Sequence, residues 1–243
     1  MKKMNRMLVI FTISGLLLTG VGVGLNAAEY ALYYACTDTQ DTALVIMNSG
    51  GKATYYTIKV YDAYGTLLEA ASGDLNGYES DYQVLSDLVG TGDTNWGLAI
   101  VESPGILTIG IETFVNGGWQ ASENVTDPVN GGNGATYYWY GLNYANTADQ
   151  ASGVAVVNPY DSPVAGTLFV YDSFGNQVDS TDILLDPHES DYFALRNLVS
   201  QSDSMWGVID IKATAPIIVA GEYFAADGTL LNVDEITRFY YSE

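Results

Sequence analysis

The sequence is poor in cysteine, histidine and basic residues. Its 243 residues include one Cys, one His and eight Lys plus Arg, against 29 Asp plus Glu, for a formal net charge of −21. One cysteine excludes an intrachain disulfide and a cysteine-based zinc site, and one histidine excludes a multi-histidine metal centre. Nucleic acid and anionic membranes are not expected partners, because every phosphate contact requires a cation. Hydrophobic residues make up 48% of the chain, which is ample for a packed core.

The first 28 residues have the pattern of a secretory signal peptide. Lys2, Lys3 and Arg6 precede an apolar run that starts at Met7, and small residues follow up to Ala28. We therefore expect a signal helix at 1–28 and export to the periplasm, the cell surface or the extracellular space. Cleavage would leave no membrane attachment. An uncleaved anchor is the alternative, because the apolar segment is about long enough to span a bilayer.

The remaining chain contains one unit twice, at a spacing of 110 residues. The segment 60–65 recurs as 170–175, and the segment 79–82 recurs as 189–192, with no gap needed between residues 32 and 118. The duplication predicts two domains, at 29–124 and 136–243. A linker rich in Gly and Asn, at 125–135, separates them.

Each unit has the sequence pattern of β-structure. Short apolar runs end in turn residues, and Val-Tyr-Asp-x-x-Gly is typical of a hairpin. Only 82–89 and 192–199 have the spacing of a helical turn. We therefore predict an all-β fold of two tandem antiparallel β-sandwich (Ig-like) domains, with a barrel as the alternative. Trp96 and Trp206 are the expected core anchors. Residues 236–241 predict an additional strand in the second unit alone.

Five motifs of the second unit carry a resemblance to a known family. They are Asn158-Pro159, Val-Tyr-Asp-x-x-Gly, Leu-x-Pro-x-Glu-Ser at 185–190, Trp-Gly at 206–207, and Pro-Ile-Ile-Val at 216–219. Together they resemble bacterial secreted Ig-like sandwiches, among which the sensory-rhodopsin-transducer-like sandwich is the nearest named type. The first unit departs from the pattern, with Gly77-Tyr78 where the second has Pro187-His188. The resemblance implies a binding or structural module and supplies no catalytic residue.

Catalytic residue types occur together at 188–191, where His, Glu, Ser and Asp are consecutive. Adjacent residues of an extended chain point to opposite faces, so these four cannot form a triad by themselves. Glycoside hydrolysis requires only two carboxylates. Glu112 and Glu222 are candidates, but each unit carries its own copy, whereas an enzyme usually builds a single site. We therefore expect no enzymatic activity.

Aromatic residues and acids supply the candidate ligand sites. With 19 Tyr and four Trp in the chain, rings on a sheet face could stack on sugars. The residues proposed for glycan or ligand binding are Tyr138, Trp139, Tyr140, Glu112 and Glu222. Those proposed for calcium, the only cofactor considered, are the loop acids Asp38, Asp41 and Asp149.

The sequence thus predicts an exported, non-enzymatic structural or adhesive protein of the cell envelope or the extracellular space. It would act through β-sandwich surfaces. Its partners would be other envelope or extracellular proteins, or further copies of itself. The alternative is a carbohydrate- or ligand-binding module, with calcium assisting, and the third choice is a carboxylate-based hydrolase.

Overall fold

The computed structural model describes residues 28–125, 137–199, 205–235 and 238–241. Apart from Ala28 and Val125, the predicted leader and linker lie outside the described residues. No helix in the described part of the chain is long and apolar enough to cross a membrane. We refer to 28–125 as repeat 1 and to the described residues from 137 onward as repeat 2.

The described chain is built almost entirely of strands, which confirms the all-β prediction. In repeat 1 the elements are β1 (Ala28–Ala35), β2 (Gln40–Asn48), β3 (Thr54–Tyr61), β4 (Leu67–Leu75), β5 (Ser80–Val84), α1 (Leu85–Val89), β6 (Trp96–Ser103), β7 (Leu107–Val115) and β8 (Gly118–Val125). In repeat 2 they are β9 (Tyr137–Ala145), β10 (Gln150–Val157), β11 (Val164–Asp172), β12 (Gln177–Leu185), β13 (Ser190–Ala194), α2 (Leu195–Leu198), β14 (Trp206–Ala213), β15 (Ile218–Ala225), β16 (Leu230–Glu235) and β17 (Arg238–Tyr241). The two short helices lie at the predicted helical turns.

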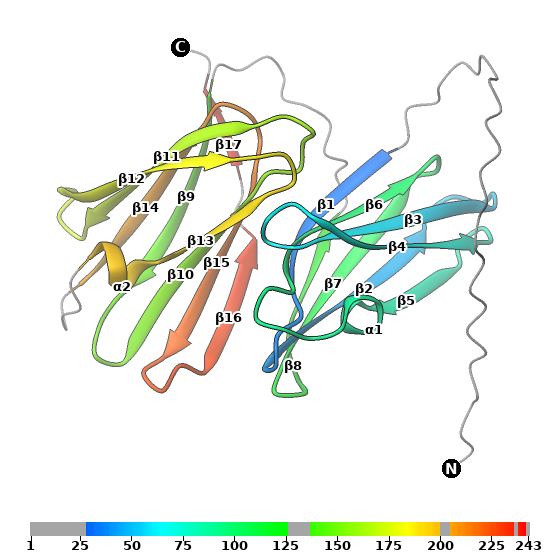
Figure 1. The fold of residues 1–243 in the computed structure, drawn as a ribbon, viewed down its shortest axis with the longest axis horizontal. Coiled ribbons are helices and arrows are strands. Elements are labelled where there is room, and N and C mark those ends of the chain that lie inside the picture. The colour runs from blue at the N-terminus through cyan, green and yellow to red at the C-terminus, as the bar shows by residue number, and fades with distance from the viewer. Residues whose placement is uncertain (1–27, 126–136, 200–204, 236–237, 242–243) are drawn as a thin grey trace.

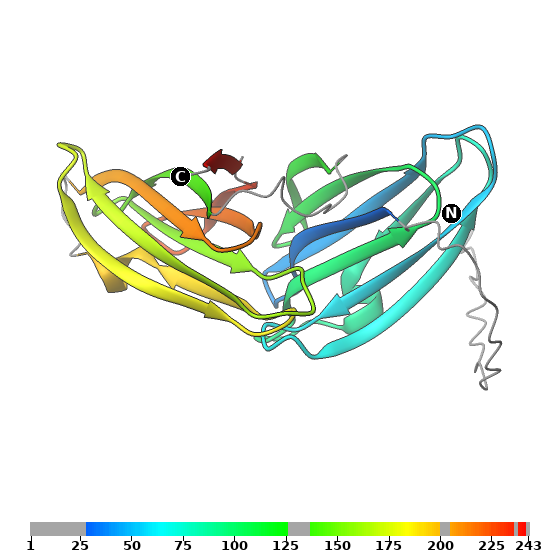
Figure 2. The same cartoon turned by 90° about the horizontal axis from the view of Figure 1, so that it is seen from above.

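The strands form four small antiparallel sheets. Repeat 1 contains β1-β6-β3-β4 and β5-β2-β7-β8, and repeat 2 contains β12-β11-β14-β9-β17 and β13-β10-β15-β16. Consecutive strands often belong to different sheets, so neighbours within a sheet come from distant parts of the sequence. Figures 1 and 2 show the two repeats side by side along the long axis of the molecule.

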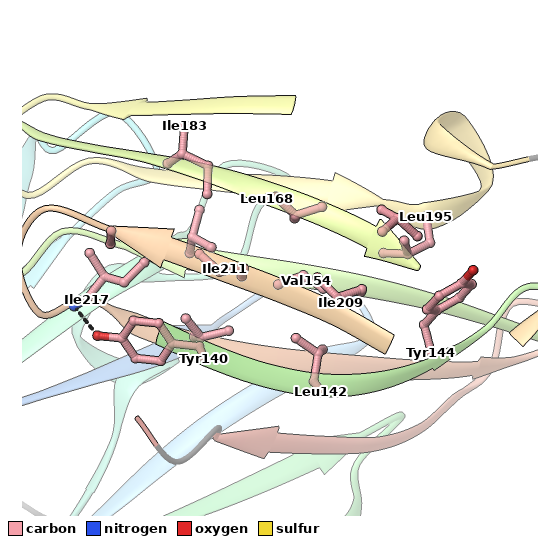
Figure 3. Close-up of a cluster of buried hydrophobic side chains, with 14 of the residues drawn as sticks. Tyr140, Leu142, Tyr144, Val154, Leu168, Ile183, Leu195, Ile209, Ile211 and Ile217 are labelled. Atoms are coloured by element: carbon pink, nitrogen blue, oxygen red, sulfur yellow. Dashed lines mark hydrogen bonds between the residues drawn. The ribbon is translucent and has the colours of Figure 1, made fainter. Parts of the chain in front are cut away.

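Alternate residues of the strands fill a hydrophobic cluster inside each repeat. In repeat 2, Tyr140, Leu142 and Tyr144 of β9 pack against Val154 and Ile209 (Figure 3). In repeat 1 the equivalent positions of β1 contribute to the equivalent cluster. The period of two follows from the pleat of a strand, which sends successive side chains to opposite faces.

A third cluster joins the two repeats. Its members from repeat 1 include Ala31, Tyr33 and Leu98, which lie on the outer face of β1 and β6, and those from repeat 2 include Ala155 and Val157 of β10. The sheets β1-β6-β3-β4 and β13-β10-β15-β16 therefore each have apolar residues on both faces.

The predicted tertiary arrangement is wrong. The four sheets are organised as the four blades of a small β-propeller, not as two tandem antiparallel β-sandwich (Ig-like) domains. The prediction assumed that each unit closes one core and exposes its outer faces to solvent. The cluster between the repeats contradicts this assumption, because it completely buries outer-face residues such as Leu98.

The predicted tryptophan anchors are also wrong. Trp206 is 57% exposed, and Trp96 is half-buried against the cluster between the repeats instead of lying in a core of its own repeat. Fully buried tyrosines occupy the centres instead, among them Tyr30 and Tyr140. The Tyr30 hydroxyl accepts a hydrogen bond from the backbone N–H of Leu107 (2.8 Å), and the Tyr140 hydroxyl accepts one from that of Ile217 (2.7 Å; Figure 3). The two bonds are equivalent, because Leu107 and Ile217 are 110 positions apart.

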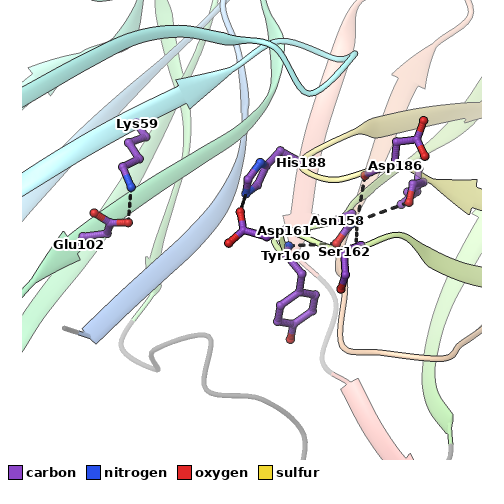
Figure 4. A network of polar contacts seen from close by, with 9 residues as sticks. Lys59, Glu102, Asn158, Tyr160, Asp161, Ser162, Asp186 and His188 are labelled. Carbon is purple, nitrogen blue, oxygen red and sulfur yellow. Dashed lines mark hydrogen bonds and ion pairs between the residues drawn. The ribbon is translucent and has the colours of Figure 1, made fainter. Parts of the chain in front are cut away.

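Buried asparagines hold the turns that connect the sheets. Asn158 is fully buried, and its side-chain amide donates to the carbonyl groups of Ser162 (2.8 Å) and Asp186 (2.9 Å; Figure 4). Asn48 makes the same pair of bonds in repeat 1, to Lys52 and Asn76. The turns therefore have the same internal framework in both repeats.

Candidate functional site

Two equivalent pockets lie at corresponding places in the two repeats. We define the repeat-1 pocket by Thr37, Gln40, Tyr82 and Phe114, and the repeat-2 pocket by their counterparts 110 residues later, Thr147, Gln150, Tyr192 and Phe224. Their volumes are about 390 Å³ and about 380 Å³. Each is formed by the loop after the first strand, the end of the short strand before the helix, and the last hairpin of the repeat.

The loop at each pocket has the same hydrogen-bonded structure. The hydroxyl oxygen of Thr37 accepts from the backbone N–H of Gln40 at 3.1 Å, and that of Thr147 accepts from the N–H of Gln150 at 3.2 Å. In both loops the threonine N–H also donates to the glutamine carbonyl group, at 2.9 Å. These bonds fix the backbone, and both glutamines line their pockets; the Gln40 side chain also interacts with Glu222 of repeat 2.

The two pockets differ in charge. Asp38 and Asp41 line the repeat-1 pocket, whereas Arg196 lines the repeat-2 pocket, where Ala151 stands at the position equivalent to Asp41. The Asp41 carboxylate accepts hydrogen bonds from Ser86 and from the thiol of Cys36, so it also ties the loop to α1. Burial raises the pKa of the Cys36 thiol to about 12, which keeps it protonated and inert.

The aromatic residues proposed for ligand binding lie on two faces of β9. Tyr138 and Tyr140 are 4% and 2% exposed and belong to the core of repeat 2. Trp139 points to the opposite face, where its ring stacks on Phe169 at a centroid distance of 6.4 Å. The ammonium group of Lys212 lies 5.3 Å from the Trp139 ring. The ring is therefore already engaged by neighbouring side chains.

The two proposed glutamates have tyrosine partners at equivalent positions. The Tyr82 hydroxyl donates to Glu112 at 2.9 Å, and burial together with this carboxylate raises the pKa of Tyr82 to about 12. Glu222 is only 4% exposed and accepts from Tyr33 of repeat 1 at 3.1 Å, with Tyr192 as a second donor. Burial raises the pKa of Glu222. The structure does not bring the two glutamates into one site, because they lie on different sheets with separate partners.

The three acids proposed for calcium lie in or next to the loops of the two pockets. Asp38 belongs to the repeat-1 loop, Asp41 follows that loop in β2, and Asp149 belongs to the loop of repeat 2. Among the residues that the structure describes, no group of three or more His, Cys, Asp or Glu side chains could hold a metal ion. Calcium binding therefore stays a prediction.

The single histidine, His188, lies in a turn at the boundary between the repeats. Its ring stacks on Tyr61 of repeat 1 at a centroid distance of 4.3 Å, and its Nε2 lies 3.2 Å from Asp161 (Figure 4). The backbone of His188 has φ 61°, and that of its counterpart Tyr78 has φ 63°.

Sequence reasoning missed the pocket residues Gln40, Gln150, Phe114 and Phe224. The signal was present as Thr-x-x-Gln at 37–40 and again at 147–150. Amides and isolated phenylalanines do not indicate a binding site by residue type. Only the repetition of the Thr-x-x-Gln spacing in both repeats indicates a binding site.

No family model and no curated protein matches the chain. Among solved structures, it is similar to a Pleurotus ostreatus lectin in complex with GalNAc, with 10% identity, a TM-score of 0.26, and coverage of 92% of this chain and 83% of that one. The PBSX exported protein XepA has 10% identity, a TM-score of 0.24 and coverage of 78% and 85%. A glycosyl hydrolase family 2 member from Bacteroides cellulosilyticus has 13% identity, a TM-score of 0.19 and coverage of 88% and 28%. At these TM-scores the likeness carries no argument.

Proposed function

We propose that the protein binds carbohydrate, without converting it, through the repeat-1 and repeat-2 pockets. The observation that carries the proposal is the repetition of one pocket, with an aromatic side chain beside an amide, in both repeats. The apolar face of a sugar ring packs on aromatic carbon, and its hydroxyl groups pair with amide and hydroxyl groups. Volumes of about 380 to 390 Å³ lie within the ordinary range of small-molecule sites.

The charge difference between the pockets suggests two kinds of sugar. Carboxylates accept hydrogen bonds from neutral sugar hydroxyl groups, so Asp38 favours a neutral sugar in the repeat-1 pocket. Arg196 can pair bidentately with a carboxylate, which favours an acidic sugar in the repeat-2 pocket.

Two pockets on one chain favour binding to a polymer or a decorated surface. Linking two weak sites makes the second contact intramolecular and raises the overall affinity without any new contact. This fits the predicted exported protein, whose partners would be extracellular or envelope glycans. Calcium assistance and an additional structural or adhesive role remain part of the proposal.

A glycan array with the full chain tests the proposal. Phe114→Ala and Phe224→Ala each remove one aromatic wall, and we expect each to weaken binding about ten- to a hundredfold at its own pocket. The double variant should lose binding. Tyr55→Ala, which truncates an aromatic residue that is 56% exposed on β3, is the control.

Circular dichroism would establish that all variants are folded. The proposal is wrong if the wild type retains no glycan, or if the double variant binds as well as Tyr55→Ala.

A further inference from the structure

The interface between the repeats uses two surfaces, and each has a second copy elsewhere in the described residues. We call the residues of repeat 1 that receive repeat 2 the receiving face: Tyr33, Tyr61, Ala63, Trp96 and Leu98. The segment of repeat 2 that enters it, 186–192, is the docking turn. By the 110-residue duplication, repeat 2 has a receiving face of its own, and repeat 1 has a docking turn at 76–82.

Ring contacts and backbone hydrogen bonds define the occupied interface. Tyr61 stacks on His188 at 4.3 Å, and Trp96 meets Tyr192 edge-on at 6.3 Å. The N–H of Ser190 donates to the carbonyl group of Ala63 at 3.0 Å.

Glycine allows the closest approach in this interface. A Cβ atom on Gly65 would lie 2.4 Å from the carbonyl oxygen of Pro187. Next to it, Tyr64 and Glu189 form an isolated β-bridge. The docking turn is therefore held by backbone contact as well as by side chains.

Within the part of the chain that the structure describes, the receiving face of repeat 2 is open. Asn143, Tyr171, Trp206 and Val208 line a hollow of about 400 Å³. Trp206 is 57% exposed and Val208 40% exposed, whereas their counterparts Trp96 and Leu98 are packed against the other repeat.

The turn beside this hollow is also uncovered. Phe174 is 88% exposed, and a Cβ atom on Gly175 would meet nothing within 4 Å. The backbone around it matches that of the occupied face, because Asp172 accepts from the N–H of Phe174 at 2.8 Å as Asp62 does from that of Tyr64 at 2.9 Å.

The docking turn of repeat 1 is preformed, and its Tyr78 is exposed. The carboxylate of Glu79 accepts from the N–H of Asn76 at 2.7 Å, as that of Glu189 does from Asp186, also at 2.7 Å. Tyr78 takes the place of His188 with nearly the same φ and is 75% exposed, and Tyr82 is 44% exposed. No rearrangement of the turn is required before it docks.

We propose that copies of this chain associate head to tail, with the docking turn of repeat 1 of one copy seated on the receiving face of repeat 2 of the next. Both ring contacts inside the chain have a compatible counterpart. Tyr78 would stack on Tyr171, as His188 does on Tyr61. Trp206 would meet Tyr82 in the same way that Trp96 meets Tyr192.

The polar contact is also conserved in kind. Inside the chain Tyr33 donates to Glu222; between copies the amide of Asn143 would donate to Glu112. Because the two surfaces differ, the contact is heterologous and leaves one free surface at each end, so it generates filaments or closed rings.

This contact is weaker than the one inside the chain. Asp210 stands at the position equivalent to Ile100, which belongs to the cluster between the repeats, and the net charge of −21 makes copies repel each other. Salt screens that repulsion, so association should increase with protein concentration and with ionic strength.

Mixing two blocked variants gives a decisive test. Val208→Asp places a charge on the receiving face of repeat 2, and Tyr78→Asp removes the ring of the repeat-1 docking turn while keeping a residue that tolerates positive φ. Sedimentation of the full-length wild type, from micromolar to millimolar concentration in high salt, should show growing mass. Each variant alone should stay monomeric, and an equimolar mixture should stop at a heterodimer, because each variant retains one intact surface.

Tyr55→Ala, outside both surfaces, should associate like the wild type. A wild type that stays monomeric throughout would overturn the proposal. Variants that associate as the wild type does, or a mixture that forms no heterodimer while the wild type associates, would overturn it as well. Glycan binding of the monomeric variants is independent of this outcome.

Discussion

Glu112 and Glu222 occupy equivalent positions, yet their surroundings give them different roles. Glu112 bonds to Tyr82 on an outer face, whereas Glu222 is buried between the repeats with Tyr33 as a donor. A buried carboxylate loses hydration that two or three hydrogen bonds restore only in part. Glu222 therefore makes the contact between the repeats sensitive to pH.

The sign of this sensitivity follows from the raised pKa of Glu222, which lies above its ordinary value of 4.5. The folded protein binds this proton more tightly than the unfolded chain, so the contribution of Glu222 to stability is greatest below its unfolded pKa. That contribution is lost as the pH rises through the folded pKa. We expect Glu222→Gln to gain free energy of unfolding relative to the wild type as the pH rises above the unfolded pKa of about 4.3.

Urea denaturation at several pH values measures this difference. Glu112→Gln is the matched control, since the same substitution is made at the equivalent position outside the interface. The expectation is contradicted if the difference in free energy of unfolding between the wild type and Glu222→Gln does not change with pH.

The tyrosines on the first strand of each repeat link one residue to the packing of whole elements. Tyr140 on β9 and Tyr30 on β1 each bond a backbone N–H at the start of a strand of the opposite sheet. Tyr140→Phe and Tyr30→Phe leave that N–H unpaired in the core. We expect each to lower the free energy of unfolding by about 1–3 kcal/mol in chemical denaturation. Tyr55→Phe, at an exposed position of β3, should change it little, and equal effects at all three positions would refute this account.

The C-terminal strand distinguishes the two repeats at the scale of elements. β17 pairs with β9 of its own sheet, from Arg238 opposite Tyr140 to Tyr241 opposite Tyr137. The predicted extra strand is thus confirmed, and it closes the sheet of its own repeat.

Deleting residues 236–243 removes β17 and exposes the edge of β9. We expect a loss of about 0.5–3 kcal/mol in the free energy of unfolding and a lower melting temperature. A melting temperature equal to that of the full chain would show that β17 contributes nothing to the sheet.

The sequence allowed prediction of the strands, the duplication and the two helical turns, because each depends on local spacing. Alternation of apolar residues tells which side chains share a face, but it does not tell what covers that face. For this reason Trp206, predicted to be a core anchor, is exposed, while Glu222 is buried by a strand from the other repeat. The pockets escaped prediction because their walls come from three separate segments of the chain.

At the scale of the molecule, the third hydrophobic cluster decides whether the two repeats behave as one unit. Each repeat has its own buried cluster, and the outer-face residues around Leu98 join the two. Whether the two repeats are separate domains, as predicted, therefore depends on how strongly this cluster couples the unfolding of one repeat to that of the other.

Leu98→Asp places a charge in the cluster between the repeats, where the Leu98 side chain is completely buried. Since neither repeat's internal cluster contains Leu98, we expect the calorimetric transition to split in two, with the transition temperature of each repeat lower than in the intact protein. Val208→Asp makes the same change at the equivalent, 40% exposed position of repeat 2, and under dilute conditions it should unfold as the wild type does. A single sharp transition for Leu98→Asp would mean that the four sheets fold as one cooperative unit, without separable domains.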